Sequence, residues 1–195
     1  MKILDTFYLE LVSIFGLCSE LNAAQNNWQT HLKRAANVPP TTIDSIMYFG
    51  RSDPNNPNAS YQYKRTLRDL CQNADKDGVN ALLIRKMAVT FAYALWESKY
   101  RALIARESGK TTNEIASKIF ADLNKYRQAV LHANSRLDRA TEVFQFCKVG
   151  EPLNLSEQNF YELFKLIVAE LNHLAKEYHS LETGYDLDNF LLGKK

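Results

Sequence analysis

The sequence predicts an all-α protein, an antiparallel bundle of four long helices with short helices between them. Apolar residues recur at steps of three and four along four long segments, as they do on one face of a helix. No stretch of useful length alternates apolar and polar residues in the manner of a half-buried strand. With 195 residues, 46% of them hydrophobic and 24% charged, the chain is long enough for one substantial core. We therefore expect a single helical domain over residues 1–195.

The first long helix is expected to run from Leu4 to a point before Pro39 and Pro40. Its apolar face misses one step, at Gln25, and otherwise consists of Phe7, Leu11, Ile14, Cys18, Leu21, Trp28 and Leu32. Four of the five prolines and the run "DPNNPNAS" lie just beyond it, and this composition favours turns over packed elements. Residues 37–60 are therefore predicted to form an exposed loop.

Two further helices are expected in the middle of the chain. A short one contains Leu67, Leu70 and Cys71 and ends at the turn signal "NADKDG". A long one extends from Val79 to about Arg106. Because its apolar residues cover more than one face, we expect it to be central and packed on several sides.

The last two long helices are marked by a capping signal and by two regular stripes. In "TTNE", Thr111 can accept a hydrogen bond from the amide of Glu114 while Glu114 reaches back, as in the capping box of a helix start. The stripe that follows is Ile119, Leu123, Tyr126 and Val130. After an irregular segment, residues 136–155, the final helix is expected to begin near Ser156. Its stripe is Phe160, Leu163, Ile167, Leu171, Leu174, Tyr178 and Leu181.

The composition excludes several classes of function. A formal charge of +2 is too small for a globally basic nucleic-acid-binding domain, so any such contact needs a local patch. Three widely spaced cysteines suit buried thiols in a reducing compartment, and the start of the chain lacks the apolar core of a signal peptide. No segment has the roughly 18 apolar residues of a membrane span. We expect a cytoplasmic protein without a membrane partner.

Common catalytic and ligand-binding motifs are missing from the sequence. It has no Gly-rich phosphate loop, no Cys-x-x-Cys, no His-Glu-x-x-His and no Gly-x-Ser-x-Gly. His173 and His179 are six residues apart on the last helix, which puts them on different faces, so they do not form a metal pair. We expect neither a metal nor a cofactor.

The segment "LNKYRQAVLHANSRLDR" raises one chemical possibility, because Arg127 precedes His132 by five residues. Arginine presents a planar fork of donors that suits a phosphate, and an imidazole can both give and take a proton near neutral pH. Together they could cleave a phosphodiester. The alternative is a solvated helix charge and a helix-end histidine, since five positions separate two side chains by about 140° on an ideal helix.

The pair Arg127 and His132, followed by Asn134, resembles the Arg-x(4–6)-His signature of the HEPN superfamily, all-helical domains found in many prokaryotic ribonuclease toxins and antiviral systems. "YALWESKYRALIA" resembles the central helix of that superfamily, with an acidic residue after an aromatic one. "VGEPLNLSEQNFYELFKLIVAEL" resembles its Gly-containing turn and final helix. The resemblance covers residues 79–182.

This resemblance implies a HEPN-like fold and a metal-independent endoribonuclease, a toxin or antiviral effector that leaves a 2′,3′-cyclic phosphate. It implies a homodimer in which two motifs face each other, RNA as substrate and a possible cognate antitoxin. His132 would transfer protons and Arg127 would stabilise charge on the phosphate. The longer Gln128 after the arginine and Ala133 after the histidine depart from the family pattern. Two alternatives therefore stay open, an inactive HEPN-like module that binds RNA or a partner, and a helical interaction protein without a nucleic-acid role.

Four residues near the motif are candidates for supporting roles, each with a structural alternative. Glu97 could orient Arg127 or tune His132, or it could form a salt bridge within its own helix or to a neighbouring one. Tyr126 could stack on RNA, or it could be a core aromatic. Gln128 and Asn134 flank the two motif residues and belong to the same candidate site.

Overall fold

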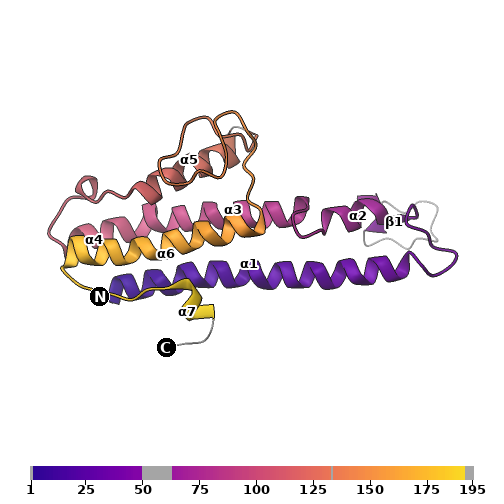
Figure 1. The fold of residues 1–195 in the computed structure, drawn as a ribbon, viewed down its shortest axis with the longest axis horizontal. Coiled ribbons are helices and arrows are strands. Elements are labelled where there is room, and N and C mark those ends of the chain that lie inside the picture. Colours follow the sequence, from indigo (N-terminus) through magenta and orange to yellow (C-terminus); the bar gives the residue numbers. More distant parts are fainter. Residues whose placement is uncertain (1, 50–62, 133, 192–195) are drawn as a thin grey trace. The chain divides into compact units, whose positions relative to one another are not determined.

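The computed structural model describes residues 2–49, 63–132 and 134–191 (Figure 1). The chain is mostly helical, as the periodicity predicts. Its α-helices are α1 (Lys2–Ala35), α2 (Leu67–Asn73), α3 (Val79–Leu95), α4 (Arg101–Glu107), α5 (Lys118–His132), α6 (Glu157–His179) and α7 (Leu187–Leu191). A π-helical turn, η1 (Trp96–Tyr100), joins α3 to α4, and a 3₁₀ turn, η2 (Thr112–Glu114), precedes α5. Two short strands are β1 (Ile46–Phe49) and β2 (Tyr63–Thr66).

The chain divides into two compact units, where the sequence predicted one domain. Unit 1 consists of Met1–Ser19 and Ile84–Lys195, and unit 2 of Glu20–Leu83. Helices α1 and α3 each contribute to both units. The motif residues Arg127 and His132 belong to unit 1.

The core of unit 1 is built on stacked aromatic rings from several helices. Phe7 of α1 lies on Tyr100 with ring centroids 4.1 Å apart, and Trp96 lies on Phe120 of α5 with centroids 4.2 Å apart. Helix α6 joins the same core, because its stripe from Phe160 to Tyr178 is buried. Helix α5 is thereby fixed against the π-helical turn along its buried side.

The π-helical turn explains why Glu97 lies outside the core of an apolar helix. Trp96 and Tyr100 are both buried, whereas Glu97, Ser98 and Lys99 between them are exposed. π-Helical turns inside α-helices are often found at functional sites. Here the turn directs the Glu97 carboxylate to the surface of unit 1.

Unit 2 has a much smaller core, made of Leu32, Leu67, Leu70 and Cys71. Strands β1 and β2 pair antiparallel, with Ile46 opposite Thr66. Strand β1 falls within residues 37–60, for which the sequence predicts an exposed loop. Three of its four residues are exposed, so no alternation of apolar and polar residues marks it as a strand. Residues 50–60 lie outside the described part of the chain.

Gly78 permits the tight turn between α2 and α3. A Cβ atom placed there would lie 2.5 Å from the carbonyl oxygen of Gln72 and 2.6 Å from that of Asn73. Any side chain would therefore force the backbone to move. The turn predicted from "NADKDG" is confirmed between α2 and α3.

Three details of the predicted helices need correction. Leu21 and Trp28 are exposed, although they continue the stripe of α1. The single helix expected from Val79 to Arg106 contains the π-helical turn η1, and Met87 and Phe91 leave part of its apolar surface exposed. The Thr111 capping box is present, but it starts the 3₁₀ turn η2, and α5 begins only at Lys118.

The three cysteines are free, buried thiols. Burial raises the pKa of Cys18 to about 11, against the opposing effect of the Arg85 guanidinium. A thiol with so high a pKa is a poor nucleophile at neutral pH. Cys18 therefore has a packing role.

Candidate functional site

Helix α5 carries both motif residues, and it directs them to different neighbours. Arg127 is partly buried, and its guanidinium carbon lies 5.6 Å from the centroid of the Tyr93 ring on α3. This distance is within the range of a cation–π contact. Arg127 is therefore held against α3, where its planar group covers an aromatic face.

Glu97 and Arg127 both contact Tyr93. The Tyr93 hydroxyl donates to Glu97 Oε2 at 3.3 Å, and Arg101 Nη1 donates to the same oxygen at 3.3 Å. Burial, followed by the nearby Glu97 carboxylate, raises the pKa of Tyr93, so its phenol remains a donor at neutral pH. The predicted ion pair of Glu97 within its own helix is thus present, with Arg101 as the partner.

His132, the last residue of α5, is exposed and lines an open hollow of about 460 Å³. Gln128, one turn earlier, lines the same hollow. The other lining residues are Asn124, Lys125, Asp138 and Arg139. Two cations and one carboxylate therefore surround His132, and Arg127 is not among the lining residues.

Asp138 and Arg139 come from the irregular segment that follows α5, and a buried carboxylate holds that segment in place. Asp122 of α5 accepts hydrogen bonds from the amides of Glu142 at 3.0 Å, Val143 at 2.6 Å and Phe144 at 3.1 Å. Lys125 Nζ donates to the same carboxylate at 2.8 Å.

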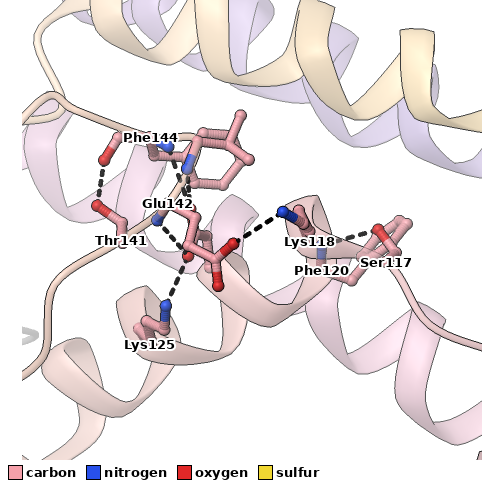
Figure 2. Close-up of polar contacts among 9 residues, drawn as sticks. Ser117, Lys118, Phe120, Lys125, Thr141, Glu142 and Phe144 are labelled. Atoms are coloured by element: carbon pink, nitrogen blue, oxygen red, sulfur yellow. Dashed lines mark hydrogen bonds and ion pairs between the residues drawn. The ribbon is translucent and has the colours of Figure 1, made fainter.

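The close-up in Figure 2 shows how the segment is attached to α5 near that carboxylate. Lys118 of α5 pairs with Glu142 at 3.2 Å, and the Thr141 hydroxyl donates to the carbonyl of Phe144. Burial of a carboxyl by itself raises its pKa, but the hydrogen bonds from Lys125 and from the three amides outweigh burial and hold the pKa of Asp122 below its usual range. The carboxylate stays charged, and the segment stays in place, at neutral pH.

Two of the predicted supporting residues have clear structural roles. Tyr126 is completely buried, and its hydroxyl lies 3.6 Å from the Cys147 sulfur, so its ring is not available to stack on a base. Asn134 is exposed with a φ of 49°, a left-handed conformation that asparagine tolerates better than most residues. Ser135 N–H then donates to the Ala129 carbonyl at 2.9 Å, which closes the end of α5. Ala133 lies outside the described residues.

The structure brings together His132 and Gln128 and leaves Arg127 with Tyr93 and Glu97. Asn124 lines both the His132 hollow and a second one, of about 280 Å³, that Tyr93, Glu97 and Arg101 also line. The two groups are therefore neighbours along one surface of α5 and α3.

Sequence reasoning missed Asn124, Lys125, Asp138 and Arg139. Lys125 could have been found, because it lies seven residues before His132 and so shares its helix face. Asp138 and Arg139 line the hollow only because the irregular segment folds back on α5, and no periodic pattern in the sequence predicts that.

Among the described residues, no group of three or more histidines, cysteines, aspartates and glutamates is arranged to hold a metal ion. None of the described helices has the length and apolar character needed to span a bilayer. Comparisons of the chain with protein-family models, with curated proteins and with solved structures gave no match.

Proposed function

We propose that this chain is a HEPN-like helical bundle that acts as a metal-independent endoribonuclease, in the manner of a toxin or antiviral effector. One observation carries the proposal. His132 stands exposed at the end of α5, in a hollow that also contains Gln128 and the cationic side chains of Lys125 and Arg139. A phosphodiester bound there would have a proton-transfer group and positive charge within one site.

The proposed reaction needs only an internal nucleophile. His132 takes the proton of a ribose 2′-hydroxyl, and the oxygen attacks the adjacent phosphorus. The bond from phosphorus to the 5′-oxygen breaks, a 2′,3′-cyclic phosphate remains, and the leaving oxygen takes a proton from solvent or from a protonated imidazole. Arg139 lies 3.9 Å from the Asp138 carboxylate, and its side chain is largely exposed, so it can turn toward the negative phosphate. Lys125 is paired with Asp122 at 2.8 Å.

Arg127 has a different part in this proposal. Because Asn124 lines both hollows, an RNA strand that leaves the His132 hollow along α5 passes close to the Tyr93 and Arg127 contact. A guanidinium there can donate to a phosphate in a bidentate manner. Arg127 then holds the strand in the position that His132 requires.

The test is cleavage of a defined single-stranded RNA in EDTA by three proteins, the parent, His132→Ala and His173→Ala. His173 is the matched control, because it is an exposed histidine on α6 that pairs with Glu177 at 2.9 Å, outside the hollow. We expect His132→Ala to lower the rate by about 10² to 10⁴ and His173→Ala to leave it unchanged. The product should carry a cyclic phosphate end. Equal rates for all three proteins, or loss of parent activity in EDTA, would exclude the proposed catalytic role.

A second candidate function is an RNA-binding module that does not cleave, and the Arg127 contact favours it. A guanidinium engaged with Tyr93 and a histidine in a separate hollow do not act on one phosphate without rearrangement. Arg127→Lys separates the candidates, because it keeps the charge but loses the planar fork. In a nuclease, Arg127→Lys lowers the rate by about 10² or more, because the strand is no longer held in register with His132. In a binding module the parent binds RNA and makes no product.

A further inference from the structure

Unit 1 has an apolar groove on the surface between α1 and α3, and none of its lining residues lines either hollow of the candidate site. It has a volume of about 550 Å³, and its lining includes Leu9 and Ser13 of α1 together with Phe91 and Ala94 of α3. The only charged side chain in the lining is Glu10, which is neutralised by Lys99 at 2.6 Å. The groove therefore offers no attraction to a phosphate backbone.

The same surface continues along both helices. The pairs Glu10 with Lys99 and Cys18 with Ile84 show that α1 and α3 run antiparallel side by side. Leu17 and Met87 therefore lie one turn beyond Ser13 and Phe91, on the same face of their helices. The exposed fractions are 56% for Leu9, 57% for Leu17, 48% for Met87 and 55% for Phe91.

The size of this surface fits an interface between two chains. A large apolar side chain has on the order of 200 Å² of surface, so the four half-exposed ones leave about 400 Å² uncovered on each copy. Two copies contribute about 800 Å². A standard interface of about 1,600 Å² that is about 65% apolar needs roughly 1,000 Å² of apolar surface, and the partly exposed Ile14 and Leu95 supply most of the difference.

We infer that the occupant of this groove is a second copy of the chain, related by a two-fold axis. An isologous interface must be complementary to itself, because the same patch occurs on both sides. The patch meets that condition, since large side chains such as Phe91 and Leu9 adjoin the small Ser13 and Ala94 on one face. Phe91 of one copy can then lie over Ser13 and Ala94 of the other. This dimer leaves the His132 hollow open, and it does not depend on the proposed ribonuclease activity.

The inference is tested by measuring the mass of the protein in solution by light scattering or sedimentation over a range of concentrations. The parent should be a dimer, and Phe91→Glu should weaken dimerisation by at least about 30-fold, because it places a charge in the centre of the interface. Leu131→Glu is the matched variant. Leu131 is an exposed helical leucine, 50% accessible, next to His132. We expect it to leave the dimer intact.

The two variants also distinguish a dimer formed through the groove from a dimer formed at the Arg127 and His132 motif. If Leu131→Glu dissociates the dimer and Phe91→Glu does not, the two-fold axis lies at His132 and the inference is wrong. It is also wrong if the parent is a monomer at every concentration tested.

A second experiment does not depend on how well Phe91→Glu folds. Ala94→Cys should be joined into a covalent dimer by a short bis-maleimide reagent, because both copies of residue 94 lie within the interface. Gln145→Cys, an exposed position in the segment after α5, should remain monomeric under the same conditions. The three native cysteines are buried, so they give little background. Equal cross-linking at both positions would contradict the groove as the interface.

Discussion

At the scale of single residues, Asp122 has the greatest influence on the candidate site, although it does not line the hollow. Its carboxylate accepts three backbone amides of the segment that carries Asp138 and Arg139, as well as the ammonium of Lys125. A group that gathers four donors in a buried position has no substitute of equal capacity. An asparagine would offer one acceptor oxygen and turn an N–H₂ group toward backbone donors.

We expect Asp122→Asn to lower the free energy of unfolding by about 2–3 kcal/mol, because buried amides are left without an acceptor. Asp138→Asn is the control, a carboxylate in the same region with about half of its side-chain surface exposed, and it should leave the melting temperature nearly unchanged. Chemical denaturation of the three proteins measures the difference. Similar losses in both variants would mean that Asp122 does not anchor the segment.

The difference in stability between the parent and Asp122→Asn should depend on pH, because the pKa of Asp122 is lowered in the folded protein. A carboxyl whose pKa is lower in the folded state stabilises the protein fully above its unfolded pKa, about 3.9, and loses that contribution as the pH falls toward the folded pKa. The gap in stability between the parent and Asp122→Asn should therefore be constant near pH 6 and shrink below about pH 4.

At the scale of elements, the sequence predicted the extents of α1 and α6 well, because each has a periodic stripe with a clear end. It predicted the buried stripe of α5 but placed the start of that helix at Thr111, before its actual start at Lys118. Ser156 caps α6 by accepting the amide of Asn159, as the position before a periodic run suggests. β1 and β2 were missed, since their exposure on most positions leaves no alternation to detect. The placement of His132 in a hollow depends on the fold of residues 134–156, which no local pattern reports.

The end of α5 provides a test of how that element terminates. Asn134 has a φ of 49°, so Asn134→Gly should keep the stability of the parent, whereas Asn134→Val should cost about 1–2 kcal/mol. Thermal unfolding compares the three proteins. If the residue had a catalytic role instead, Asn134→Gly would abolish RNA cleavage without a change in melting temperature.

At the scale of the whole molecule, the two units differ in how well their helices are buried. The part of α1 in unit 1 buries six residues, Leu4, Phe7, Leu11, Val12, Phe15 and Cys18, whereas the part in unit 2 buries only Leu32. One continuous helix therefore combines a well-packed half and a largely solvated half. Helices with little tertiary packing open more readily.

Hydrogen exchange followed by mass spectrometry should show this difference within α1. Amides of residues 21–31 should exchange faster than those of residues 6–18, because the core of unit 2 is smaller and holds its part of the helix less firmly. The first half of the same helix is the internal control. Uniform protection along α1 would indicate that the second half is covered in solution.

The anchored segment after α5 has a consequence for how this protein can change over evolutionary time or be engineered. Asp122 fixes residues 142–144, while Asp138 and Arg139 stand exposed between that anchor and the buried Leu137. Replacing the two exposed residues alters the charge around His132 and leaves the packing of the core untouched. Substitutions at Asp138 and Arg139 can therefore change which ligands the hollow prefers, with almost no loss of folding stability.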